Sequence, residues 1–285
     1  MKEKSNILVA TDFSARADQV LEYCSAMARQ KGYEIFLLHV FNPETLDRGV
    51  NAKQEEMNIS LKLEKTAHEY SVKQGIEISP ILVKGNIFRS ITQTAREVNS
   101  MLIAMAMHRK SPIQELIGRF AFRIITASTL PVLLMHHKAD FKGFDNILLP
   151  LDFMEKNQKK LAAARNFALE FNSTIHAMTV VEENGWLSNF RLRNAMNKTQ
   201  DFFHKAGLQC ETLILKKRFI PVFQCIVDYA RKNELDGIFI MTRNEDDIDS
   251  FLVGSTSERI IENSEVPLIT TSPRVKINEN KKVFP

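Results

Sequence analysis

Two copies of one short pattern decide the fold of this chain: NILVATDF occupies residues 6–13, and NILLPLDF occupies residues 146–153. The copies share their first three and last two residues, and they lie 140 residues apart, as the difference between Asp152 and Asp12 shows. In each copy a short apolar run is followed by polar residues, a pattern typical of a strand buried on both faces. The pattern therefore predicts one buried strand near the start of each of two related halves.

The end of each half repeats as well. Residues 117–119 (IGR) correspond to residues 253–255 (VGS), and residues 130–133 (LPVL) correspond to residues 266–269 (VPLI), each 136 residues further on. Three blocks in the same order indicate a duplicated domain. We therefore expect one domain at residues 1–139, a second at residues 140–275 and a polar tail at residues 276–285.

Strands and helices alternate within each half. A second strand at residues 34–41 precedes a long amphipathic helix near residues 53–74, and Gly75 and Gly207 stand where helix C-cap glycines are expected. The other expected strands are at residues 78–83, 101–105, 131–135, 174–181, 210–215, 237–241 and 267–271, and the other helices include those near 188–206, 119–128 and 255–263. This alternation predicts the α/β class: two repeated Rossmann-like domains, each a five-stranded parallel sheet flanked by helices.

Composition excludes several protein classes. The chain has 285 residues, 44% hydrophobic and 25% charged, as in an ordinary globular protein. Its longest apolar run, residues 101–107, is far shorter than the ~20 residues of a membrane helix. The apolar run at residues 7–10 is too short for a secretory signal of about 7–15 apolar residues. We therefore expect a cytoplasmic protein with no membrane partner.

The net charge and the cysteines predict neither a nucleic-acid partner nor a metal site. A net charge of +4 is spread over the whole chain, whereas a nucleic-acid binder gathers basic residues on one face. We therefore expect no nucleic-acid partner. The three cysteines, Cys24, Cys210 and Cys225, lack metal-site spacing, so we expect buried thiols in a reducing compartment and no metal.

The expected binding crevice lies beyond the carboxyl ends of the strands, where ligands bind in open parallel sheets. Asp12 and Asp152 end the first strands of the two halves. The segments after the fourth strands begin at Met105 and Met241. In each half, we expect the end of the first strand and the segment after the fourth strand to face each other across one crevice.

At this point the chain resembles the universal stress protein family in its tandem form, over residues 6 to about 272. The resemblance rests on Asp12 and Asp152, on LLHV at residues 37–40, on Gly118 and Gly254 before the last helices, and on the closing strands that begin with Pro131 and Pro267. It implies domains like those of the adenine nucleotide alpha hydrolases. It also implies that the halves pair through their fifth strands as an internal pseudo-dimer, with a further homodimer left open.

Nucleotide-binding members of that family carry G-x2-G-x9-G-[S/T] after the fourth strand. The candidate cofactor-binding residues are Asp12, Val40, Gly118, Asp152, Val180, Asn244, Gly254 and Ser255. The chain departs from the pattern, because Met105 and His108, and Met241 and Asn244, stand where glycines are expected. Glycine lets backbone N–H groups approach phosphate oxygens, whereas methionine fills that space. Arg119 also replaces the hydroxyl residue in the first half.

Several candidates have two interpretations. Asp12 and Asp152 either contact an adenine or form a cap or turn before the next helix. Ser255 either binds phosphate or forms a capping box with Glu258. The acidic run at residues 245–249 lacks the pattern of a calcium loop and is expected to be a surface loop.

The histidines and the tryptophan receive simpler interpretations. His39 is expected to be a satisfied histidine in the core or crevice. His136 and His137 are expected at the surface, and Trp186 is expected to anchor a helix or an interface.

The function expected from these observations is a non-enzymatic stress-response regulator with a degenerate nucleotide site and protein partners of unknown identity. The alternative is a sensor that binds ATP or another adenine nucleotide, and the second half, with Asp152, Gly254 and Ser255, is favoured for it. A third alternative is a nucleotide hydrolase that depends on Asp12 or Asp152. No cofactor is firmly predicted.

Overall fold

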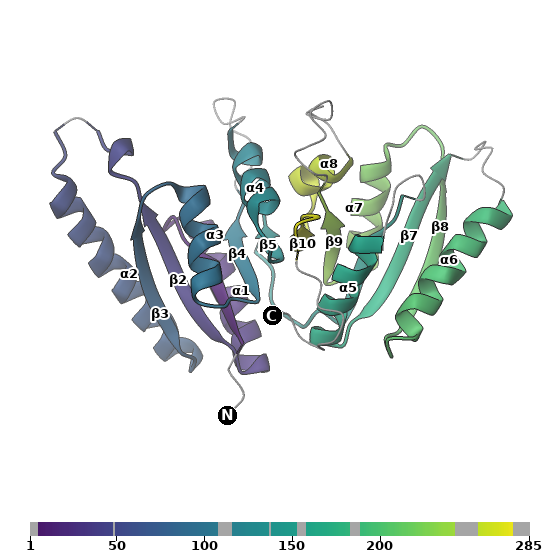
Figure 1. Cartoon of the computed structure of the whole chain (residues 1–285), viewed down its shortest axis with the longest axis horizontal. Coiled ribbons are helices and arrows are strands. Elements are labelled where there is room, and N and C mark those ends of the chain that lie inside the picture. Colours follow the sequence, from purple (N-terminus) through teal and green to yellow (C-terminus); the bar gives the residue numbers. More distant parts are fainter. Residues whose placement is uncertain are drawn as a thin grey trace. The chain divides into compact units, whose positions relative to one another are not determined.

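The chain forms two compact units, Met1–Phe141 and Lys142–Pro285, shown in a computed structural model (Figure 1). The structure describes residues 5–47, 49–107, 116–136, 138–152, 158–182, 189–242 and 256–275. The sequence places the domain boundary after residue 139, and the structure divides the chain after Phe141.

Unit 1 contains one parallel sheet with the strand order β3-β2-β1-β4-β5. Its strands are β1 (Asn6–Ala10), β2 (Glu34–Phe41), β3 (Ile78–Lys84), β4 (Leu102–Ala106) and β5 (Val132–Met135). Its helices are α1 (Ala15–Lys31), α2 (Ala52–Gln74), α3 (Ile87–Glu97) and α4 (Leu116–Ala127), with a short 3₁₀ turn, η1 (Pro43–Thr45). The β1 strand is central because Ile7, Leu8 and Val9 are fully buried.

Unit 2 repeats this arrangement with the order β10-β9-β6-β7-β8, also entirely parallel. Its strands are β6 (Asn146–Pro150), β7 (Thr174–Glu182), β8 (Cys210–Lys217), β9 (Gly237–Met241) and β10 (Leu268–Thr271). Its helices are α5 (Gln158–Phe171), α6 (Asn189–His204), α7 (Val222–Lys232) and α8 (Thr256–Asn263). The predicted α/β class and the duplication are confirmed.

Local sequence signals explain most element bounds. The Ser14 side chain caps α1 by accepting from the Ala17 N–H at 3.2 Å, and Gly32 ends that helix at φ +74°. Gly75 ends α2 at φ +67°, as its position in the sequence predicts. The start of α4 differs from the prediction of a helix near residues 119–128. This helix begins at Leu116, so Gly118 lies in its first turn instead of before it. Leu116 and Ile117 can extend the helix because neither residue breaks it.

The buried residues confirm one expectation and overturn another. Cys24, Cys210 and Cys225 are free, buried thiols, and burial raises the pKa of Cys24 and raises that of Cys210 to about 12. His136 is buried, 8% exposed, so its predicted surface position is wrong. Pairing between β4 and β5 continues beyond Ala106, because the Met107 N–H donates to the Met135 carbonyl oxygen at 2.8 Å, so His136 directly follows a residue that is held in the sheet. His137 lies outside the described residues.

Within the described ranges, none of the helices is both long enough and apolar enough to span a bilayer.

Candidate functional site

Asp12 lies at the carboxyl edge of the unit 1 sheet, the edge at which the parallel strands end. It is exposed, and its Oδ1 accepts from the Ser14 N–H at 3.0 Å. This bond makes Asp12 a turn residue, and the helix cap is Ser14. Of the two local roles predicted for Asp12, the turn is therefore correct and the cap is wrong. Because Asp12 is exposed, its carboxylate is accessible to solvent.

Phe13, the next residue, has a left-handed backbone with φ +60°, which is strained for an aromatic residue. Its ring stacks on His39, with centroids 4.6 Å apart and planes at 28°. On α2, the ammonium of Lys62 lies 4.4 Å from the Phe13 centroid. The stack lies just beyond the end of β1, at the carboxyl edge where the crevice of unit 1 is expected.

Two titratable groups beside this stack have shifted pKa values. Burial raises the pKa of Asp18; Lys62 opposes the shift and Asp12 adds to it. Burial lowers the pKa of His39, against the bond to the Thr11 carbonyl and the charge of Asp12. The ring nitrogen Nδ1 of His39 lies 2.8 Å from the Thr11 carbonyl oxygen, so this nitrogen carries the proton. The expectation of a satisfied crevice histidine is confirmed.

The lowered pKa of His39 has a consequence for stability. Protonating a group whose pKa is lower in the folded state favours unfolding, so its contribution is complete above about pH 6.5 and is lost as the pH falls below that value. We expect the free energy of unfolding of the His39→Gln variant to fall less than that of the wild type between pH 7.5 and pH 5. Urea unfolding at a series of pH values measures this difference. Parallel pH profiles for the two proteins would contradict it.

The exit of β4 is filled by methionine side chains. Met105 is 6% exposed and Met107 is 2% exposed, and β4 pairs with β1 and β5 through Met105. Arg16, in the first turn of α1, donates from Nη1 to the Met107 carbonyl oxygen at 3.3 Å. A guanidinium therefore lies at the position where the chain leaves β4.

A cavity of about 300 Å³ lies along the same edge, at the ends of β2 and β3. It is lined by Asn42, Pro43, Glu44, Lys84, Gly85 and Asn86. The two asparagine side chains cap η1 and α3, and Lys84 forms an ion pair with Glu56 at 2.6 Å. The lining residues are thus already engaged in holding two turns. Val40, the β2 candidate, is 8% exposed.

In unit 2, Asp152 is exposed at the end of β6, in the position that Asp12 has in unit 1. The Lys160 ammonium, from the first turn of α5, donates to the Pro150 carbonyl oxygen at the carboxyl end of β6. The residue 140 positions earlier is the buried Val20, so this cation is peculiar to unit 2. Val180, on β7, is partly exposed. Asn244, Gly254, Ser255, the acidic run at 245–249 and Trp186 lie outside the described residues.

A model of the universal stress protein family matches the chain twice, over residues 4–136 and 143–271. The chain belongs to the universal stress protein family. Among its relatives is universal stress protein MJ0577 of Methanocaldococcus jannaschii, 27% identical over 153 residues, which are 46% of this chain and 94% of that one. Universal stress protein MJ0531 of the same organism is 25% identical over 140 residues, 44% of this chain and 81% of its own. Each relative therefore matches about half of this tandem family member.

The crystal structure of a universal stress protein from Archaeoglobus fulgidus has the same fold over 95% of this chain and 99% of its own. The TM-score is 0.74 and the sequence identity is 21%, a level at which the likeness concerns the fold.

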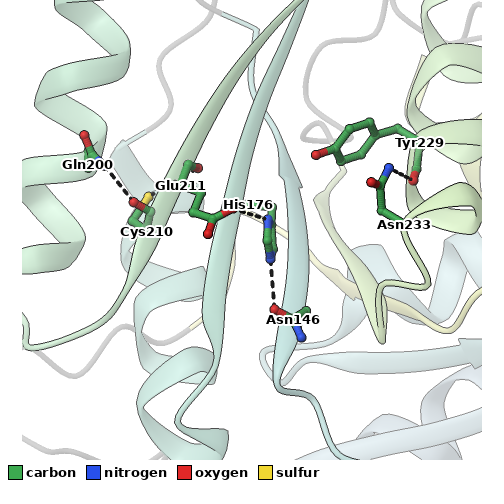
Figure 2. A network of polar contacts seen from close by, with 7 residues as sticks. All are labelled: Asn146, His176, Gln200, Cys210, Glu211, Tyr229 and Asn233. Carbon is green, nitrogen blue, oxygen red and sulfur yellow. Dashed lines mark hydrogen bonds and ion pairs between the residues drawn. The ribbon is translucent and has the colours of Figure 1, made fainter.

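A second polar cluster of this family member lies at the opposite, amino edge of the unit 2 sheet (Figure 2). His176 Nε2 is 3.0 Å from Asn146 Oδ1, and His176 Nδ1 is 3.2 Å from Glu211 Oε2. The matching residues in unit 1 are Phe36 and Ser79, by the same strand register. Because both ring nitrogens are engaged and the cluster lies away from Asp152, it joins β6, β7 and β8 at their starts instead of forming part of the crevice.

Sequence reasoning missed three cations at the crevices: Arg16, Lys62 and Lys160. Arg16 follows Asp12 by four residues, a spacing that could have placed it beside the crevice. Lys62 and Lys160 lie on helices, where no local pattern separates them from solvated lysines. In the described part of the chain, no group of three or more His, Cys, Asp or Glu side chains could hold a metal ion.

Proposed function

We propose that this family member is a non-enzymatic stress-response regulator that acts through protein partners, with nucleotide binding weakened in both units. The observation that carries the proposal is the buried pair Met105 and Met107 at the exit of β4. Nucleotide-binding members of the family carry glycine at the position of Met105, and backbone N–H groups can approach phosphates only where side chains leave room. Arg16 also engages the Met107 carbonyl and ties this backbone to α1.

Calorimetric titration with ATP and Mg²⁺ tests the weakened site. We expect the wild type to bind more weakly than about 1 mM, which corresponds to about −4 kcal/mol. The double variant Met105→Gly, His108→Gly restores the glycines of unit 1 and is expected to bind more tightly, provided that its thermal unfolding stays cooperative. Low-micromolar binding by the wild type would contradict the proposal.

The same titration distinguishes the regulator from the second candidate function, an adenine-nucleotide sensor. This function is favoured by the exposed carboxylate of Asp152 and by the ammonium of Lys160 at the same edge of unit 2. If ATP binds, if Ser255→Ala abolishes that binding and if Arg119→Ala preserves it, the sensor replaces the regulator. Pairing of the two halves as an internal pseudo-dimer and a cytoplasmic location remain part of the proposal.

A further inference from the structure

The turn after β8 is longer than its counterpart in unit 1. Ile35 pairs with Ile78, and the matching residue Ile175 pairs with Cys210. The following helices begin at Ile87 and Val222, nine and twelve residues after the paired position. From the paired position to the helix, unit 2 therefore has three additional residues, one of them within β8 and two in the turn after it.

The longer turn exposes apolar side chains on a strained backbone. Phe219 is 90% exposed and Ile220 is 48% exposed. Phe219 also has φ +61°, a conformation that costs free energy for any residue except glycine. The Arg218 guanidinium lies 5.1 Å from the ring centroid and covers one face of the ring. A strained aromatic residue that packs against no core is not explained by the stability of the fold, and such strain points to function.

A second exposed aromatic residue lies at the same edge of unit 2. Phe190, in the first turn of α6, is 78% exposed. The α6 helix follows β7, packs against β7 and β8, and begins where those strands end (Figure 1). Phe190, Phe219 and Ile220 are all of the large, well-exposed apolar residues in the described part of unit 2, and each follows the carboxyl end of one of the paired strands β7 and β8.

Basic residues flank these three side chains in the sequence. We define the basic corner as residues 182, 190–193 and 216–221, which contain five basic residues and one acidic residue, a net charge of +4. Arg191, Arg193, Lys216 and Arg218 are exposed, and Lys217 bonds to Glu182.

We propose that the basic corner binds the surface of an anionic lipid bilayer. Phe219 and Ile220 insert among the lipid head groups, and the surrounding arginine and lysine side chains contact lipid phosphates. Aliphatic Ile220 and Pro221 gain from insertion into lipid but offer no face for base stacking, which favours a membrane over a nucleic acid. Such a contact is peripheral and needs no membrane-spanning helix. The expectation of no membrane partner rested on the short apolar runs of the sequence, so it does not bear on this contact.

The test is co-sedimentation of the full chain with vesicles of phosphatidylcholine alone or of phosphatidylcholine and phosphatidylglycerol at three to one. We expect binding to the anionic vesicles only, and weaker binding at high salt. Phe219→Gly should weaken the binding at least about five-fold, because the inserted ring is lost. The double variant Lys216→Gln, Arg218→Gln should weaken it by about five-fold per charge.

Phe219→Gly also separates function from folding. Glycine relieves the positive φ at no cost in buried area, so the melting temperature of this variant should rise while its lipid binding falls. Val72→Ala, which truncates a residue of α2 that is 70% exposed, is the matched control and should bind as the wild type does.

Four results would overturn the proposal. They are no wild-type binding to anionic vesicles, unchanged binding by Phe219→Gly, equal loss in Val72→Ala, and wild-type binding to a single-stranded oligonucleotide or an acidic protein at this corner without binding to vesicles.

Discussion

Replacing Phe167 with alanine is expected to lower the free energy of unfolding of unit 2 by about 3–5 kcal/mol. Phe167 is 1% exposed and lies at the centre of an aromatic cluster. Its ring centroid is 5.2 Å from that of Phe144, 4.7 Å from that of Phe171 and 5.9 Å from that of Phe239. Truncation leaves a cavity that α5 and the sheet cannot both close, because the neighbouring strands are held by their hydrogen bonds.

Urea unfolding followed by circular dichroism measures this change. Phe190→Ala is the matched control, since that ring is 78% exposed and its loss should change stability by less than about 0.5 kcal/mol. A loss below about 1 kcal/mol for Phe167→Ala would show that the cluster does not hold the core of unit 2 together.

The second large effect is expected at Gly237, the first residue of β9. A Cβ added there would lie 2.7 Å from Ile269 Cδ1 and 3.1 Å from the Pro267 carbonyl oxygen. The carbonyl belongs to the backbone and accepts from the Ile238 N–H at 3.0 Å, so it cannot move freely. We expect Gly237→Ala to destabilise unit 2 by about 1–3 kcal/mol through overpacking.

A double-mutant cycle isolates the cause. Ile269→Val removes the Cδ1 atom that the new methyl group would meet, so the double variant should be more stable than the sum of the two single changes implies. Strict additivity in thermal unfolding would mean that the cost of Gly237→Ala does not arise from this contact.

Apolar periodicity was sufficient to predict the strands and the helices, because these follow from which residues must leave water, and the three repeated sequence blocks predicted the duplication. The runs at residues 7–10 and 147–150 became the central strands for that reason. The sequence predicted a helix end correctly where a cap residue was present, as at Gly75. The sequence did not predict the start of α4, because a glycine such as Gly118 marks a helix boundary only in some structural surroundings.

The candidate site was only partly predictable. The position of Asp12 at the carboxyl edge follows from topology alone, but its partner does not: Asp12 and Ser14 are both good caps, and the geometry of the turn selects Ser14. The bond from Arg16 to the Met107 carbonyl joins residues 91 positions apart, which no local pattern encodes. The burial of His136, the residue after the end of β5, likewise depends on tertiary packing, which the local sequence does not encode.

The three buried thiols make each half of the chain its own chemical reporter. Alkylating reagents attack the thiolate, and burial raises the pKa of all three groups, so closed molecules are protected both by access and by protonation. Cys24 belongs to one half, whereas Cys210 and Cys225 belong to the other. The rate at which each cysteine is labelled therefore measures how often its own half opens, without a probe being added to the chain.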